Sequence, residues 1–370
     1  MSVLVLSSKT GGGHEMRAQA LVDLSNYLGI DCEIYRPLES GSPIYSLGTG
    51  IYNLIQKTYP GLHKLYFRFL ERACLHRSST FLLGKKKFYR VLNEFNPKIV
   101  VSVHAHLNHG FFNLYQDYCR ENGSKGKFVI CCGELDDGVG FSNHWINPEV
   151  HSLWVPTLQT NKAAVRRGMP AVKCKTLGPL LREPFYQDVS LLQKKSFCSK
   201  FKIDPKLPFG VLATGANGVN SHHSVLKGLI SEGNNQQIVV LCGKSSRLLN
   251  SLEALRDMAK FKIVPLPYLN PSEMSILLEL CDWVFGRPGA GLTSEVLAKQ
   301  KIMYFDISGG IMPQEQNNLN YWQSCGFQPV LVRKGFDLAY EVNQRNKLPK
   351  VKLYPDRDKV VGELRSLLNN

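Results

Sequence analysis

Short apolar runs alternate with amphipathic stretches along the 370 residues of this chain. In the first half, such runs predict strands at residues 3–6, 31–35, 99–103, 128–132 and 152–155. In the second half they predict strands at residues 209–213, 237–242, 262–266, 283–285, 301–305 and 329–332. Helix-like stretches lie between most of these strands, an order typical of βαβ units and parallel sheets. We therefore predict an α/β protein.

A proline-containing region interrupts this order. Three prolines fall within residues 182–208, which we predict to join two domains. The chain is long enough for two domains that each bury a core. We place the first at residues 1–185 and the second at residues 200–345. Doubly wound domains bind ligands at the carboxyl ends of their strands, so we expect the two domains to face each other across a cleft.

The stretch from residue 283 to 318 carries the strongest chemical signal. A predicted strand runs into a turn that contains Gly289, Ala290 and Gly291, and an amphipathic helix follows at once. The N-terminus of a helix offers unpaired N–H groups and a partial positive charge, so this turn suits a phosphate. Glu295 lies in the first turns of that helix, where its carboxylate would accept hydrogen bonds from two ribose hydroxyls.

A polar run follows the next predicted strand. Its members are Gln314, Glu315, Gln316, Asn317 and Asn318. Amide and carboxylate groups of this kind bind the hydroxyls of a sugar, and we take Gln314, Glu315 and Asn318 as the candidate contacts. Together with the glycine turn, they indicate a nucleotide-sugar site.

A second glycine-rich turn lies near the start of the chain. Gly11, Gly12 and Gly13 separate the first predicted strand from a helix expected at residues 15–28. A glycine run alone fits a flexible turn as well as a ligand site, but His14 follows it directly. Histidine can accept a proton near neutral pH, which makes His14 a candidate general base. If this turn binds an acceptor and the turn at residues 289–291 binds a donor, the two turns belong to two domains that face each other.

A third glycine-rich turn and two acidic residues complete the candidate chemistry. Backbone N–H groups at Gly215 and Gly218 would stabilise a departing diphosphate, together with those of the turn before Glu295. Glu134 and Asp136 follow a predicted strand of the first half. Both are the alternative candidates for the general base.

Several motifs, in their order and spacing, carry a resemblance to a known family. The matching segments are residues 10–14 (Thr-Gly-Gly-Gly-His), 102–104 (Ser-Val-His) with His109, 145–156, 178–180 (Gly-Pro-Leu), 287–291 (Arg-Pro-Gly-Ala-Gly), Glu295, and Gln314 and Glu315 with Asn318. On these segments the chain resembles the monogalactosyldiacylglycerol synthase and processive diacylglycerol glucosyltransferase family. That family is glycosyltransferase family 28-like and is distantly related to the MurG-type N-acetylglucosaminyltransferases.

The resemblance implies a GT-B fold and an inverting, metal-independent transfer of a hexose from a UDP-sugar to a hydroxyl of a lipid, with diacylglycerol as the expected acceptor. It implies no cofactor, because the UDP-sugar is the donor substrate. The glycines at 11–13 would contact the acceptor, and we expect His104 and His109 either to contact it as well or to have a structural role. A helix at residues 356–368, within the segment 350–370, would pack back on the first domain. The protein would be cytoplasmic and peripheral on the inner face of the cell membrane.

Three features depart from the family pattern. Glu134 stands where the family has an aspartate, and His144 directly precedes Trp145 instead of lying three residues ahead of it. The turn at residues 213–218 has fewer glycines than the usual form. These departures concern the acceptor and the donor sugar more than the reaction class.

The composition adds constraints. Hydrophobic residues make up 44% of the chain and charged residues 20%, which fits an ordered globular protein. The ten cysteines form no Cys-x-x-Cys pair, so we expect buried free thiols in a reducing compartment. We expect no signal peptide, because a strand occupies the first residues, and no apolar run reaches the roughly 18 residues that span a bilayer. His104, His106 and His109 are spaced poorly for tetrahedral ligation, so we expect no metal.

The net charge of +15 indicates an anionic partner. Residues 51–98 carry ten Lys or Arg against two acidic residues, interleaved with Tyr and Phe. This pattern suits an anionic membrane surface, although aromatic core residues with solvated cations would produce it too. The charge alone also fits a nucleic acid, but the sequence has no RRM, KH or helix-turn-helix signature, so we expect no nucleic-acid partner.

Two other classes of protein stay open. A UDP-sugar 2-epimerase of GT-B fold has a similar donor site and would isomerise a free UDP-sugar without an acceptor. The second class is a protein that binds a nucleotide sugar or a lipid without catalysis. The presence of both His14 and Glu295 argues against this class. Among glycosyltransferases, a small-molecule alcohol is the alternative acceptor. The sequence leaves the donor sugar open between galactose, glucose and N-acetylglucosamine.

Overall fold

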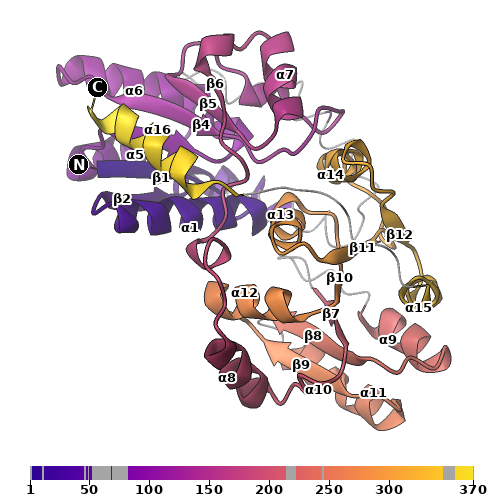
Figure 1. Ribbon diagram of the computed structural model, residues 1–370. Helices are drawn as coiled ribbons and strands as arrows, with labels where there is room; N and C mark the ends of the chain where they lie inside the picture. Colours follow the sequence, from indigo (N-terminus) through magenta and orange to yellow (C-terminus); the bar gives the residue numbers. More distant parts are fainter. Residues whose placement is uncertain are drawn as a thin grey trace. The chain divides into compact units, whose positions relative to one another are not determined.

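The computed structural model describes residues 2–10, 12–45, 47–48, 50–51, 68, 82–213, 222–243, 246–344 and 355–369. The chain divides into two compact units. The first unit comprises Met1–Glu183, Met312–Asn318 and Tyr354–Asn370, and the second comprises Pro184–Ile311 and Leu319–Leu353. Each unit is built on its own parallel sheet (Figure 1).

The first unit contains a six-stranded sheet in the order β2-β1-β3-β4-β5-β6. The strands are β1 (Ser2–Leu6), β2 (Asp31–Tyr35), β3 (Ile99–Ser102), β4 (Lys127–Cys131), β5 (Ser152–Val155) and β6 (Cys174–Thr176). The helices of this unit include α1 (Gly12–Tyr27), α2 (Pro37–Ser40), α5 (Lys85–Phe95), α6 (Gly110–Glu121), α7 (Leu158–Arg166) and α16 (Arg357–Asn369), with 3-10 turns η3 (Ala105–Leu107), η4 (Asn143–Trp145) and η5 (Ala171–Lys173).

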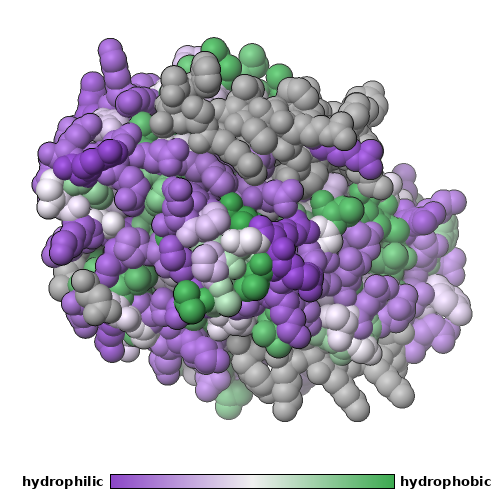
Figure 2. Space-filling model, turned by 90° about the horizontal axis from the view of Figure 1, so that it is seen from above, coloured by the Kyte–Doolittle hydropathy of each residue, from purple (hydrophilic) through white to green (hydrophobic). Residues whose placement is uncertain are grey.

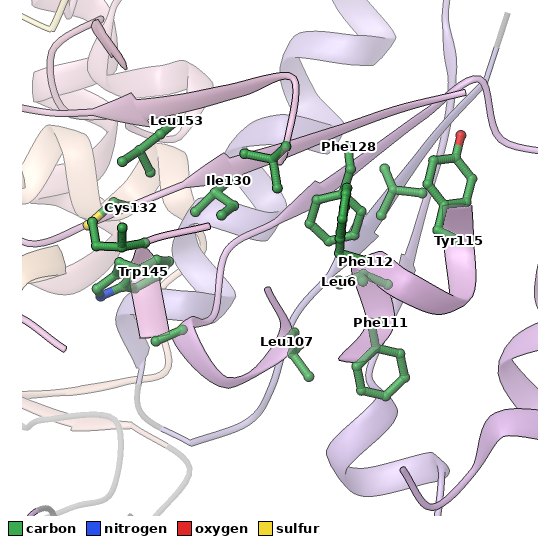
Figure 3. Packing of buried hydrophobic residues seen from close by; sticks show 14 of the residues in the cluster. Leu6, Leu107, Phe111, Phe112, Tyr115, Phe128, Ile130, Cys132, Trp145 and Leu153 are labelled. Atoms are coloured by element: carbon green, nitrogen blue, oxygen red, sulfur yellow. The ribbon is translucent and has the colours of Figure 1, made fainter. Parts of the chain in front are cut away.

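Apolar clusters cover both faces of this sheet. Successive side chains of a strand point to opposite faces, and in β1 Leu4 and Leu6 join one cluster whereas Val3 and Val5 join the other. The first cluster contains aromatic rings of α6 packed against strand residues (Figure 3). The second contains apolar residues of α1 and α16. Strands buried on both faces read as continuous apolar runs, which is why the sequence reveals them.

Helix α16 attaches to the first unit through apolar and charged contacts. Its Leu364 is fully buried in the second cluster. At its N-terminal end, Arg357 forms an ion pair of 3.2 Å with Glu183 and lies 3.6 Å from the ring centroid of Tyr27. At its other end, the Lys127 ammonium donates to the carbonyl of Leu367 at 2.5 Å. Segments from the two ends of the chain therefore share one core.

The second unit contains a six-stranded sheet in the order β12-β11-β10-β7-β8-β9. The strands are β7 (Phe209–Leu212), β8 (Gln237–Gly243), β9 (Ile263–Pro267), β10 (Trp283–Gly286), β11 (Ile302–Asp306) and β12 (Val330–Val332). The helices described in this unit are α8 (Leu191–Phe201), α9 (His222–Ser231), α10 (Ser246–Ser251), α11 (Glu253–Met258), α12 (Pro271–Leu280), α13 (Ala290–Ala298) and α15 (Gly335–Asn343). Helix α14 (Pro313–Ser324) begins in the segment that clusters with the first unit and continues into the second.

The prediction of parallel sheets made from βαβ units is confirmed, and all eleven predicted strands are present within a residue or two of their expected bounds. Three details differ. Sequence analysis missed β6, a short edge strand with a single buried residue, Cys174. The predicted join at 182–208 contains η6 (Glu183–Phe185) and helix α8, which starts with a capping box between Ser190 and Gln193. Helix α1 begins at Gly12, three residues earlier than expected.

The surface and the thiols fit a globular protein. In the described part of the face seen in Figure 2, hydrophilic residues predominate and hydrophobic ones occur in small separate groups. Among the described residues, no helix has the length and apolar character to cross a membrane. The nine described cysteines are free thiols, seven of them buried, as predicted.

Candidate active site

The carboxyl ends of β1, β3 and β4 lie side by side in the first unit. Leu6 pairs with Ser102, and Ser102 pairs with Ile130, so the three strands end at nearly the same level. The chain then continues into three polar segments: residues 7–14 after β1, 103–109 after β3 and 132–137 after β4. The predicted catalytic and acceptor residues of the first domain all belong to these segments.

The glycine turn before His14 is partly helical. Gly12, Gly13 and His14 are the first three residues of α1, so the expected loop is shorter than predicted. Gly11 lies outside the described residues. The N–H groups in the first turn of a helix have no partner within the helix, and the absence of side chains at Gly12 and Gly13 leaves them accessible.

Arg17 is the central charged group of this region, and sequence analysis did not identify it. Its side chain follows His14 by one helical turn and is 8% exposed. One guanidinium nitrogen, Nη2, lies 2.9 Å from Nδ1 of His14 and 3.4 Å from the carbonyl oxygen of Val103. The guanidinium also lies against Gly133, where an added Cβ would be 1.8 Å from Nη1. Only glycine leaves room for the guanidinium at position 133.

His14 is held as one tautomer. Its Nδ1 lies 2.7 Å from the carbonyl oxygen of Val103, which can only accept, and 2.9 Å from Nη2 of Arg17, which can only donate. The shorter contact is the one to Val103, so we assign the proton to Nδ1 and the lone pair to Nε2, and Arg17 then donates to the Val103 carbonyl at 3.4 Å. The pKa of His14 is lowered to about 3, first by burial and then by the nearby charges of Arg17 and His106, while the bond to Val103 acts to raise it. The imidazole is therefore neutral at physiological pH and a weak base.

Glu134 has the opposite electrostatic character. Burial raises the pKa of this half-buried carboxyl group to about 7, while the Arg17 guanidinium and a hydrogen bond from the Trp145 side chain act to lower it. A carboxylate with a pKa near the working pH is suited to general base catalysis. Burial also raises the pKa of Asp136, whose Oδ1 accepts a hydrogen bond of 2.8 Å from the N–H of Asp137.

Five histidine rings form a row at this edge of the sheet. The centroid distances are 4.5 Å for His14–His104, 5.5 Å for His104–His106, 5.0 Å for His106–His144 and 6.3 Å for His109–His144. The row contains the predicted acceptor residues His104 and His109, and it adds His106 and His144. In the described parts of the chain, no group of three or more His, Cys, Asp or Glu side chains is arranged to hold a metal ion.

A chain of hydrogen bonds continues from His104 to α2. Nδ1 of His104 accepts from the N–H of His106 at 3.3 Å, so its Nε2 carries the proton that is donated to the Thr10 hydroxyl at 2.9 Å. The Thr10 and Ser8 hydroxyls are 2.9 Å apart, and Ser8 donates to Glu39 Oε1 at 2.8 Å. This series of hydrogen bonds fixes the position of Thr10, the residue that precedes the glycines. No local motif in the sequence predicts these bonds.

The predicted phosphate turn of the second unit stands at the start of α13. Gly289 is the N-cap residue, and no side chain caps the helix, so the N–H groups near Ala290 and Gly291 are available to an anion. Glu295 lies in α13 and is 1% exposed. Gly215 and Gly218 lie outside the described residues.

The predicted sugar contacts belong to the beginning of α14. Their segment, Met312–Asn318, clusters with the first unit, although the sequence analysis assigned it to the second domain. Glu315 and Asn318 are buried, and Gln314 precedes them in the first turn. Glu315 also accepts a hydrogen bond of 2.9 Å from the N–H of Met312, so this carboxylate caps its own helix.

Known proteins with similar sequences fit the resemblance drawn from the motifs. The chain is 23% identical over 338 residues to monogalactosyldiacylglycerol synthase 2 (chloroplastic) of Arabidopsis thaliana, covering 86% of this chain and 68% of that protein. It is 22% identical over 349 residues to the processive diacylglycerol beta-glucosyltransferase of Bacillus licheniformis, covering 90% of this chain and 83% of that protein. The predicted resemblance to these two groups is confirmed. No protein-family model matches the chain.

Solved structures support the fold. MurG of Acinetobacter baumannii superposes with a TM-score of 0.57 at 11% identity and covers 99% of each chain. The UDP-GlcNAc 2-epimerase of Neisseria meningitidis gives a TM-score of 0.57 at 9% identity and covers both chains fully. The predicted GT-B fold, with two doubly wound domains, is thereby confirmed.

The raised pKa of Glu134 leads to a prediction for stability. Between pH 4.5 and about 7, the folded protein keeps a proton that the unfolded chain has lost, so the free energy of unfolding falls as the pH rises through this window. Glu134→Gln cannot ionise and should be more stable than the parent above pH 7 by about 1–3 kcal/mol, with no difference below pH 4.5. Urea denaturation at both pH values measures this, with the exposed Glu149→Gln as the control. Equal stability of parent and variant at high pH would contradict the raised pKa.

Proposed function

We propose that the protein is a UDP-sugar-dependent hexosyltransferase that transfers a hexose to a hydroxyl of a lipid acceptor, diacylglycerol, with inversion and without a metal ion. The observation that carries this proposal is the edge where β1, β3 and β4 end together, because it holds the half-buried carboxyl group of Glu134 next to Gly133, against which the Arg17 guanidinium lies. The names of the similar proteins, which act on diacylglycerol or form monogalactosyldiacylglycerol, support the substrate class. The enzyme class predicted from the sequence has the same support.

In the proposed reaction, the carboxylate of Glu134 accepts the proton of the acceptor hydroxyl. The hydroxyl oxygen attacks the anomeric carbon of the sugar from the side opposite the nucleotide, and the bond from that carbon to the diphosphate oxygen breaks. The products are the glycosylated lipid and UDP, and the proton leaves later from Glu134. His104 and His109, near the glycines of α1, are the proposed acceptor contacts.

The donor side of the proposal uses the start of α13 and the residues around it. The N–H groups near Gly289, Ala290 and Gly291 would stabilise the negative charge that grows on the departing diphosphate, because a helix N-terminus favours an anion. Glu295 would hold the ribose hydroxyls. Gln314, Glu315 and Asn318 remain the proposed contacts to the hexose.

The acceptor side of the proposal includes an anionic membrane surface. Most of the basic and aromatic region at 51–98 lies outside the described residues. Within its described part, Lys85, Lys86 and Lys87 form the exposed first turn of α5. Three adjacent cations would be attracted to anionic lipid headgroups, in line with a peripheral position on the inner face of the cell membrane.

A UDP-sugar 2-epimerase is the second candidate, because an epimerase matches the fold with the same TM-score as MurG. The two activities separate in one experiment. Each UDP-sugar is incubated with the protein, with and without vesicles that contain diacylglycerol, and the products are identified by mass spectrometry and nucleotide-sugar chromatography. A hexosylated lipid and free UDP support the transferase. An isomerised UDP-sugar in the absence of lipid would replace it with the epimerase.

In the same assay, Glu134→Gln should lower the rate of transfer by about a hundred- to ten-thousand-fold, the usual contribution of a general base. The affinity for UDP should change little, because the residues proposed to bind the nucleotide belong to other segments. Exposed Glu149→Gln, in the loop after η4, is the matched control and should keep the parent rate. A Glu134→Gln variant with most of its turnover would show that another group is the base.

The donor assignment predicts a loss of UDP affinity in Glu295→Ala. Removal of a charged hydrogen-bonding partner typically costs about 1–3 kcal/mol. Calorimetric titration with UDP measures the change, and Glu295→Gln, which keeps the size of the buried side chain, should fall between parent and alanine variant. Exposed Glu232→Ala in the same unit should bind UDP as the parent does. Unchanged affinity in Glu295→Ala would refute the ribose contact.

The membrane assignment predicts that replacement of Lys85, Lys86 and Lys87 by Glu weakens binding to anionic vesicles. Each cation near such a surface contributes about 1 kcal/mol. Cosedimentation at low salt measures the bound fraction. The control is the same charge reversal at the exposed residues Lys206, Lys227 and Lys260 of the second unit. If both triple variants bind equally, total charge and not this turn of α5 governs the interaction.

A further inference from the structure

Arg17 is a buried cation for which the proposed reaction has not yet accounted. Transfer of a charge out of water is costly unless partners compensate it. Within the described residues, Arg17 forms no ion pair closer than 4.0 Å, and its buried Nε has no hydrogen-bond partner. Its contacts are His14 Nδ1, the Val103 carbonyl and the backbone at Gly133. A cation held in this way acts on its surroundings mainly through its electric field.

The field of Arg17 disfavours protonation of His14. The imidazole already uses Nδ1–H to donate to Val103, so a further proton would have to bind at Nε2. The resulting imidazolium would stand with its Nδ1 only 2.9 Å from a guanidinium nitrogen. Two like charges at that distance in a buried site repel strongly. The rings of His104 and His106, the other ionisable groups that face His14, supply no negative charge.

The same field favours ionisation of Glu134. The guanidinium lies on the backbone of Gly133, the residue directly before Glu134, at a position where any side chain would displace it. Its positive charge opposes the effect of burial on the carboxyl group. The remaining groups that act on Glu134 are the neutral Trp145 side chain and the Cys132 thiol, which burial keeps protonated by raising its pKa. Arg17 is thus the cation that balances the Glu134 carboxylate.

We propose that Arg17 is the positioning residue that gives the proton-accepting role to Glu134 and withholds it from His14. This inference rests on the proposed function. The sequence alone favours His14 as the base with Glu134 as an alternative, and this proposal reverses that order. During transfer, the proton of the acceptor hydroxyl moves to a carboxylate oxygen of Glu134, while His14 stays neutral. His14 presents its Nε2 lone pair as a hydrogen-bond acceptor and does not carry the proton away.

The first test measures the protonation of His14 and needs no turnover. In protein labelled with 15N-histidine, with the His14 signals assigned by comparison with His14→Asn, the parent should show the Nδ1–H tautomer and stay neutral down to about pH 5. In Arg17→Met the titration midpoint should move up but stay below the ordinary value, because burial, the largest cause of the lowered pKa, remains. Gly133→Ala, which displaces the guanidinium but keeps its charge in the protein, should also raise the midpoint.

Controls separate the local effect from general ones. Arg17→Lys keeps the charge and should leave the midpoint low, and it remains informative if Gly133→Ala does not fold. Arg120→Met removes an exposed arginine of α6, and Gly362→Ala adds a Cβ where no atom lies within 4 Å; both should leave His14 unchanged. A parent His14 that titrates near its ordinary value, or an Arg17→Met variant that titrates as the parent does, overturns the inference.

The second test measures the pH profile of kcat/KM with the active UDP-sugar. In the parent, the rate should rise with pH through a limb near pH 7 as Glu134 ionises. In Arg17→Met this limb should move to higher pH by about one unit or more, because the opposite charge is gone. If the rise of kcat/KM in Arg17→Met occurs at the same pH as in the parent, the inference about Arg17 is overturned and the proposed function still stands. Failure of the parent to turn over any UDP-sugar overturns the proposed function, and the titration of His14 then still reports on Arg17.

Discussion

The first unit is organised by one geometric constraint, the common register of three buried parallel strands. Because β1, β3 and β4 end at the same level, the segments that follow them emerge together at a single edge. The strands are covered on both faces by apolar clusters, and apolar side chains occupy the middle of β1, β3 and β4. Every group with acid–base chemistry in this unit's site is therefore collected at that edge.

Crowding of these groups at a half-buried edge makes each of them sensitive to its neighbours. The two candidate bases come from different segments and are modified in opposite directions by burial, since burial disfavours the charged form of both an acid and a base. A histidine thereby becomes less basic and a carboxylate more basic. In the proposed reaction, the proton acceptor is therefore not the histidine of the glycine motif, because the basicity of a side chain depends on burial and on a neighbouring guanidinium as well as on residue type.

The sequence predicted the sheet well, because strands buried on both faces are apolar throughout. It missed β6, whose Lys175 and Thr176 are not apolar, and α8, because the prolines around it resemble a linker. At the site, His14, His104 and His109 could be predicted from motifs. Arg17 could not, because a single arginine on an amphipathic helix has the appearance of a surface cation. The link from Thr10 through Ser8 to Glu39 joins residues about 30 positions apart and depends on tertiary contacts alone.

The attachment of α16 has a consequence for synthesis of the protein on the ribosome. Domains usually fold as units in the order in which they emerge. Here the cluster beneath α1 includes Val360 and Leu364, which are translated only after the whole second unit. Until then, this cluster lacks the apolar side chains that α16 contributes to it. The second unit can complete its core first, and the N-terminal unit must wait for residues 357–369 before its own is closed.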